Sequence, residues 1–290
     1  MIVLLAACGD PLSNAALLED DAFLAVLPTS DRLFAPGDLL AAPSGIEVDP
    51  ALRAAVDAAY GLAPVLVLVT GSGDALRATT PDVREAGLRQ WFEVPAVGLF
   101  DGVLTSWWVN ATVAGDPDAA LAWSIDGAPD REAPYALLGA GSAEAGVANA
   151  YWDLAGSGAT LDVGPLTGVV AIGWWEQSPG LPVTSVSYYS APYDAVPLAR
   201  WVTWGDSGVA IQGWLAVTED GATWPGQLAV AHGATGGRAL GVVDTDAGEL
   251  IIERCWGPTG VTTWSDEGGV ETGDPSTCVL SDVAPVADLL

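Results

Sequence analysis

Lysine is absent from this chain of 290 residues, and its nine cationic side chains are all arginines, set against 37 Asp and Glu residues. The arginines are scattered singly, so the sequence lacks the clustered positive charge that a phosphate backbone requires. The same scarcity argues against a polybasic membrane patch. The formal net charge of −28 indicates a strongly solvated acidic surface, and we expect no nucleic-acid partner.

Histidine and cysteine are also scarce, with one histidine and three cysteines. His232 ends an apolar segment, where we expect an ordinary surface residue. Cys255 and Cys278 have no nearby Cys or His to complete a tetrahedral zinc site, so we predict no metal site and no cofactor. In an oxidising compartment these two cysteines would form a disulfide, which would leave Cys8 as the one remaining thiol.

The sequence has no apolar run of about 18 residues, so no segment after residue 8 is predicted to cross a membrane as a helix. Half of the residues are hydrophobic, which predicts a substantial core. We expect residues 9–45 to be a tether and lead-in, residues 46–284 to form a single β-rich domain, and residues 285–290 to be a C-terminal tail.

Helical signals are confined to the first third of the expected domain. Asp49 suits an N-cap, Pro50 the first helical position and Gly61 the position after the helix end, which predicts a helix over about 50–60. The run 64–69 fits either a buried strand or a continuing helix, and its helical neighbour favours helix. Residues 71–90 are expected to hold a second short helical piece.

From Trp91 onward, short runs of alternating apolar and polar residues are separated by turn sequences. Such runs occupy 91–97, 104–113, 119–125, 147–155, 167–177, 183–191, 199–204, 209–218, 227–232, 239–245, 249–256 and 261–265. The short turns leave no room for parallel crossovers. We therefore predict a mainly β fold with a small α part: a large antiparallel meander, half-barrel or barrel-like, with the helix packed on it. The alternative is a β-sandwich.

Thirteen tryptophans are present, and two pairs, Trp107-Trp108 and Trp174-Trp175, place one indole on each face of a strand. Exposed rings would suit sugar stacking or an amphipathic ligand, whereas core packing is the simpler explanation. The candidate ligand-binding residues are Trp107, Trp174, Trp201 and Trp214.

The sequence 205–208, Gly-Asp-Ser-Gly, resembles the nucleophile segment of chymotrypsin-like serine proteases. Val209 and Ala210 follow where those enzymes continue with Gly-Pro, and the only histidine comes after Ser207. A turn between two strands explains the four residues, so we predict no catalytic residue, and a serine hydrolase using Ser207 is the weakest of the candidate functions.

Leu5-Ala6-Ala7-Cys8 resembles the lipobox of bacterial lipoproteins residue for residue. The resemblance implies that residues 1–8 are a truncated lipoprotein signal peptide and that Cys8 is lipidated, although no basic residue precedes it. The segments Glu253-Arg254-Cys255-Trp256 and 273–278 are similar to the ends of uncharacterised β-rich lipoproteins of Gram-negative bacteria. Gly9 after the cysteine is compatible with outer-membrane sorting, on the periplasmic or the surface side.

These observations predict a lipid-anchored cell-envelope protein of a non-catalytic binding or interaction type, joined to the membrane through Cys8. Its curved sheet would hold an apolar or lipid ligand, by a fold-level analogy with the half-barrels that carry lipids in the periplasm. The alternative is a Trp-rich surface module that binds glycan.

Overall fold

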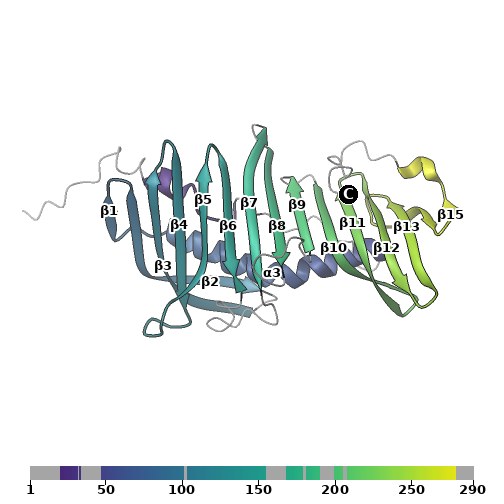
Figure 1. Ribbon diagram of the computed structural model, residues 1–290, viewed down its shortest axis with the longest axis horizontal. Helices are drawn as coiled ribbons and strands as arrows, with labels where there is room; N and C mark the ends of the chain where they lie inside the picture. Colours follow the sequence, from purple (N-terminus) through teal and green to yellow (C-terminus); the bar gives the residue numbers. More distant parts are fainter. Residues whose placement is uncertain are drawn as a thin grey trace, which may run out of the picture.

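In the computed structural model, residues 20–31, 33, 47–100, 103–154, 168–178, 181–189, 199–204 and 208–278 are described. Their strands form one antiparallel sheet in which each strand pairs with its neighbours in sequence (Figure 1). The strands are β1 (Val83–Glu85), β2 (Leu88–Phe100), β3 (Val103–Asp116), β4 (Ala120–Ala128), β5 (Ala136–Glu144), β6 (Val147–Asp153), β7 (Val169–Ser178), β8 (Leu181–Tyr189), β9 (Ala199–Trp204), β10 (Gly208–Glu219), β11 (Ala222–Gly233), β12 (Gly236–Thr245), β13 (Gly248–Trp256), β14 (Thr262–Glu267) and β15 (Val270–Gly273).

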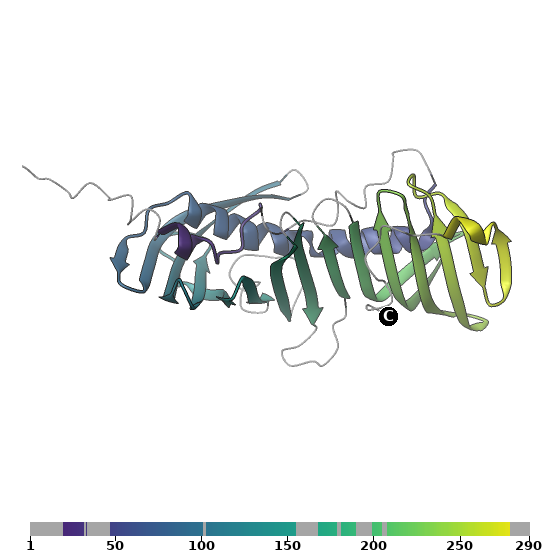
Figure 2. The ribbon, with the colours of Figure 1, turned by 90° about the horizontal axis from the view of Figure 1, so that it is seen from above.

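The predicted mainly β meander is confirmed, and the sheet is continuous from β1 to β15 instead of being divided into a sandwich. It curves along its whole length around one long helix, which gives the molecule the shape of an elongated half-barrel (Figures 1 and 2). The part of the chain that the structure describes thus has two layers, a sheet and a helix, with the core between them.

The helix α3 spans Pro50–Arg77, so the predicted end at Gly61 was wrong and the helical interpretation of 64–69 is confirmed. Asp49 caps it by accepting a hydrogen bond from the Ala51 amide at 2.9 Å. Pro64 lies inside the helix, and its two halves, Pro50–Gly61 and Ala63–Arg77, are inclined by 44°.

The helix continues past Gly61 and Pro64 because the residues beyond them are buried against the sheet, among them Val65, Leu68 and Val69. Among the described residues, no single helix is long and apolar enough to cross a membrane. The two inclined halves of α3 meet those criteria only when they are taken together.

Residues 71–77 belong to α3, and the separate helical piece expected after Pro81 was wrong, because Val83–Glu85 forms β1 and Gly87, with a φ of 72°, lies in the turn to β2. Strand β5, Ala136–Glu144, was not predicted, because small residues replace the usual β-branched ones. Its glycines fit under tryptophans: a Cβ on Gly139 would lie 2.7 Å from the Trp152 ring, and one on Gly141 would lie 2.6 Å from the Trp123 ring.

Candidate functional site

The outer face of the sheet carries a groove of about 350 Å³ over strands β9 to β12. The strand register places its side chains in two rows. Gln212 lies opposite Arg200 on one side and Ala229 on the other, and Trp214 lies opposite Gln227. Leu240 and Val242 extend the two rows onto β12.

The groove combines one aromatic surface with several hydrogen-bonding groups. Trp214 is 53% exposed, which is unusual for so large an apolar side chain. Gln212 and Gln227 each offer an amide donor and an acceptor beside it. Arg200 lines the groove as well, and its Nε has no hydrogen-bond partner among the described residues. The arrangement can stack a flat ring and bind its polar substituents.

A second and larger groove, of about 1070 Å³, lies where α3 begins, between the helix and strands β10 and β13–β15. Arg254 of β13 is buried beside it and pairs through Nη2 with Glu219 at 2.7 Å and with Glu267 at 2.6 Å. The helix cap Asp49 lies 3.8 Å from Arg254 Nη1 and accepts a hydrogen bond from Thr262 at 2.8 Å. Three carboxylates therefore surround one guanidinium.

Burial raises the pKa of Asp49, while the hydrogen bond from Thr262 and the charge of Arg254 lower it. Glu47, Asp57 and Asp220 add further negative charge along the groove, with Arg53 as a further cation. Val48, Leu250 and Val261 give it apolar surface. The groove can therefore accept an amphipathic molecule that carries a positive charge, but it repels anions.

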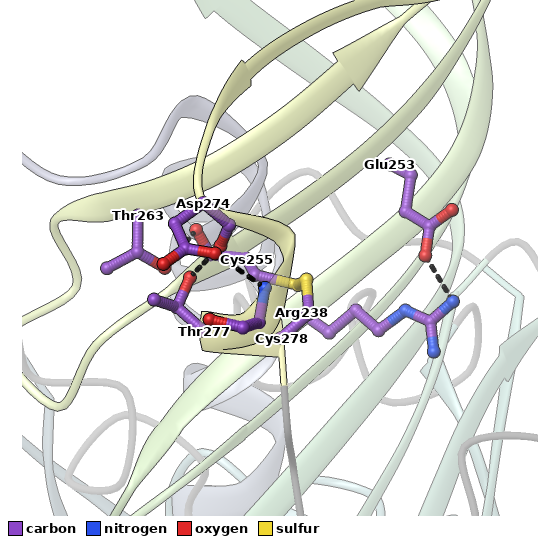
Figure 3. The surroundings of a disulfide bond; sticks show 8 residues. Arg238, Glu253, Cys255, Thr263, Asp274, Thr277 and Cys278 are labelled. Atoms are coloured by element: carbon purple, nitrogen blue, oxygen red, sulfur yellow. Dashed lines mark hydrogen bonds and ion pairs between the residues drawn. A yellow bond between two sulfur atoms is a disulfide. The ribbon is translucent and has the colours of Figure 1, made fainter.

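Cys255 and Cys278 are joined by a disulfide, with their Cα atoms 5.5 Å apart (Figure 3). The bond links β13 to the short 3₁₀ helix Pro275–Cys278 that follows β15. Asp274 lies beside it, and its backbone carbonyl accepts a hydrogen bond from the Thr277 hydroxyl at 2.6 Å. Arg238 and Glu253 form an ion pair nearby on β12 and β13 (Figure 3).

The four tryptophans predicted to bind a ligand do not come together. Trp107 and Trp174 are buried in the core, and Trp107 Nε1 donates to Ser72 of the helix at 3.0 Å. Trp201 pairs in the ladder with Val186 and Ile211, and its side chain lies outside the described residues. Only Trp214 is described as exposed, so a surface ligand would meet this ring and its polar neighbours.

His232 is not the ordinary surface residue that its place at a strand end suggested. It is half-buried, its Nδ1 accepts a hydrogen bond from Trp256 Nε1 at 2.9 Å, and burial lowers its pKa. Ser207 and Cys8 lie outside the described residues. Within the described ranges, no three His, Cys, Asp or Glu side chains are grouped so that they could hold a metal ion.

The residues that sequence reasoning missed at the Trp214 groove are its polar ones. Gln212, Gln227 and Arg200 are far apart in sequence, and only the antiparallel register brings them together. The exposed positions of alternating strands could have identified the amides, but not their neighbours. No protein-family model, curated protein or solved structure matches the chain.

Proposed function

We propose that this protein is a non-catalytic binding protein of the cell envelope that binds glycan in the groove at Trp214. Lipidated Cys8 would anchor it to the membrane. The observation that carries the proposal is the exposed indole of Trp214 beside two glutamine amides on the outer face of the sheet. Sugar rings present flat C–H faces that stack on an indole, and hydroxyls that pair with amides.

The concave face, where a lipid ligand was expected, is less favourable along its described length. The side chains of α3 fill it, and Leu52, Leu66 and Leu76 are buried in the joint core. The outer groove, in contrast, is open and uncharged except for Arg200, and Gln212, Trp214 and Gln227 are exposed in it. This contrast favours glycan over an acyl chain.

Calorimetric titration of the full-length chain with soluble oligosaccharides (chitotetraose, cellotetraose and a muropeptide) tests this proposal. We expect one of these sugars to bind, and Trp214→Ala to weaken its binding by up to about tenfold, because a stacked ring contributes about 0.5–1.5 kcal/mol. Trp108→Ala is the matched control, since Trp108 is half-buried on a distant strand. Equal affinity in the wild-type and Trp214→Ala proteins would refute the site.

The proposed lipidation of Cys8 is tested separately. Radiolabelled palmitate should enter the full-length protein in Gram-negative cells and should not enter a Cys8→Ser variant. Incorporation into both proteins, or into neither, would contradict lipidation without bearing on the glycan groove. We also predict that a fluorophosphonate probe does not label Ser207.

A second candidate ligand is an amphipathic molecule in the groove at the start of α3. The observation in its favour is the volume of about 1070 Å³, with apolar Val48, Leu250 and Val261 beside carboxylates. Native mass spectrometry should then show a co-purifying amphiphile that carries a positive charge. Its loss in Val261→Arg, with retention in Trp214→Ala, would assign it to this groove.

A further inference from the structure

Most arginines of this chain are paired with acidic side chains. The structure describes eight of the nine arginines, and six of these form an ion pair with a carboxylate: Arg77, Arg84, Arg89, Arg131, Arg238 and Arg254. The two exceptions are Arg53 and Arg200, whose side chains form no ion pair or hydrogen bond with the described residues. Arg53 is exposed on the first turn of α3, where water can solvate it.

Arg200 has no such explanation, because it is half-buried. Its Nε is covered and has no hydrogen-bond partner among the described residues. Arg238 and Arg254 also have a covered Nε without a partner, but each of them pairs through Nη2 with a carboxylate. A partly desolvated charge that lacks an opposite charge is costly. The guanidinium of Arg200 is therefore held against the sheet with its charge uncompensated by any described side chain.

This arginine lies in the Trp214 groove, close to the indole. Gln212 of β10 is directly opposite Arg200 in the ladder, and Trp214 follows two residues later on the same face. Such a diagonal relation places Arg200 and Trp214 about 7–8 Å apart. One sugar ring can therefore stack on the indole while a substituent of that ring reaches the guanidinium.

The two grooves differ in the sign of their charge. Among the described residues that line the Trp214 groove, none is acidic and Arg200 is the only charged one. The groove at the start of α3 is instead lined by five carboxylates and two arginines. An anion is thus attracted to the first groove and repelled by the second, although the whole protein carries a net charge of −28.

We propose that the Trp214 groove takes an acidic sugar, whose carboxylate pairs with the Arg200 guanidinium while its ring stacks on Trp214. This step rests on the proposed binding of glycan. The planar guanidinium offers two parallel N–H donors to the two oxygens of a carboxylate, and the amide of Gln212 is placed to bind a neighbouring hydroxyl. One guanidinium balances one negative charge, which fits a uronic acid better than a phosphorylated sugar with nearly two.

The test compares tetragalacturonate with its fully methyl-esterified form, which has the same rings without the charge. Calorimetric titration of the full-length protein should show about tenfold tighter binding of the acid than of the ester. Arg200→Gln should abolish this preference and leave the affinity for the ester within about twofold, since only a charge is lost. Arg53→Gln, which removes the other unpaired arginine, is the matched control and should preserve the preference.

Two further measurements separate a binding role of Arg200 from a structural one. The melting temperature of Arg200→Gln should not fall, because the wild-type charge lacks a described partner whose loss would destabilise the fold. Arg200→Lys should retain part of the preference, because it keeps the charge but not the planar pair of donors. Added salt should reduce the preference of the wild-type protein.

The possible failures are distinguishable. If the acid and the ester bind the wild-type protein equally, or if Arg200→Gln keeps the preference, the acidic sugar is refuted and the glycan groove stands. Tighter binding of a sulfated oligosaccharide than of tetragalacturonate would also overturn the carboxylate. If no saccharide binds, neutral or acidic, the proposed function fails and this inference fails with it.

Discussion

A buried arginine that pairs with carboxylates lies near each end of α3, but the two ends differ in how far they are covered. At its C-terminal end, residues 20–31 and the outer half of the β2–β3 hairpin, beyond the bulge between Trp91 and Val94, cover the helix, and buried Arg89 pairs with Asp20 at 2.6 Å. At its N-terminal end, buried Arg254 pairs with Glu219 and Glu267. There the helix borders a groove of about 1070 Å³.

The difference shows that one end of α3 is covered by other segments of the chain, whereas the other end borders a groove that a ligand can enter. At the closed end, Arg89 also lies over the Phe23 ring, 4.5 Å from its centroid, and its Nη1 donates hydrogen bonds to the Glu85 and Leu88 carbonyls. At the open end, Glu219 and Glu267 are each about one-third exposed and face the groove. The buried arginine there keeps a set of carboxylates in place where a molecule can reach them.

The largest expected effect is on the open end. Arg254→Leu removes the cation that faces three carboxylates, one of them the buried Asp49. Breaking such a pair from one side costs about 3–4 kcal/mol, since the remaining charges keep their desolvation penalty. Urea unfolding should measure this loss, and Arg53→Leu, an exposed arginine on the same groove, should change stability by less than about 0.5 kcal/mol.

The pH dependence provides a second check on this variant. The folded-state pKa of Asp49 lies above its unfolded value, so its ionisation costs stability as pH rises through the interval between the two. Because Arg254 lowers that pKa, its loss should widen the interval. The deficit of Arg254→Leu should therefore be smallest in acid, and a pH-independent deficit would contradict an electrostatic cause.

Substitutions of two glycines on α3 test the same comparison between covered and open parts of the helix, with smaller expected changes in stability. Gly71 lies against the hairpin, whereas a Cβ on Gly61 would meet nothing within 4 Å. Gly71→Ala should destabilise the protein by about 1–2 kcal/mol through crowding against Val97 and Trp107. Gly61→Ala should stabilise it by about 0.5–1 kcal/mol, because alanine favours the helix.

Thermal unfolding of both glycine variants, monitored by circular dichroism, gives the measurement. Opposite signs on one helix would confirm that the hairpin covers α3 at Gly71 and that the helix faces open space at Gly61. Two stabilising substitutions would show that the hairpin does not press on the helix at Gly71.

The regular parts of the fold could be predicted from the sequence. Short alternating runs and turn sequences predicted most strands, because a half-buried strand repeats every two residues. Strand β5 was not predicted because Gly139 and Gly141 are there to make room for the rings of Trp152 and Trp123. This requirement arises from tertiary packing and leaves no local sequence pattern. The full length of α3 was not predicted for the same reason. Burial against the sheet outweighs the tendency of Gly61 and Pro64 to end a helix.

The candidate site was predictable only in part. Trp214 was predicted as a ligand-binding residue because an exposed tryptophan can stack on a ligand. The sequence gives Trp107 and Trp174 the same signal, but both are buried. Separating them requires knowing which face of each strand the helix covers. Gln212, Gln227 and Arg200 could not be grouped without the register.

The smallest expected effect on stability concerns His232, which lies on β11. Burial lowers its pKa, and its Nδ1 must be unprotonated to accept the Trp256 hydrogen bond. The unfolded chain therefore binds a proton more readily, so stability should decline as pH falls below about 6.5 and through the folded-state pKa. Melting temperatures between pH 5 and 7.5 should show this decline in the wild type and not in His232→Asn, whose amide oxygen can accept the same bond without titrating. An equal decline in both proteins would show that other groups cause the pH dependence and would exclude His232 as its source.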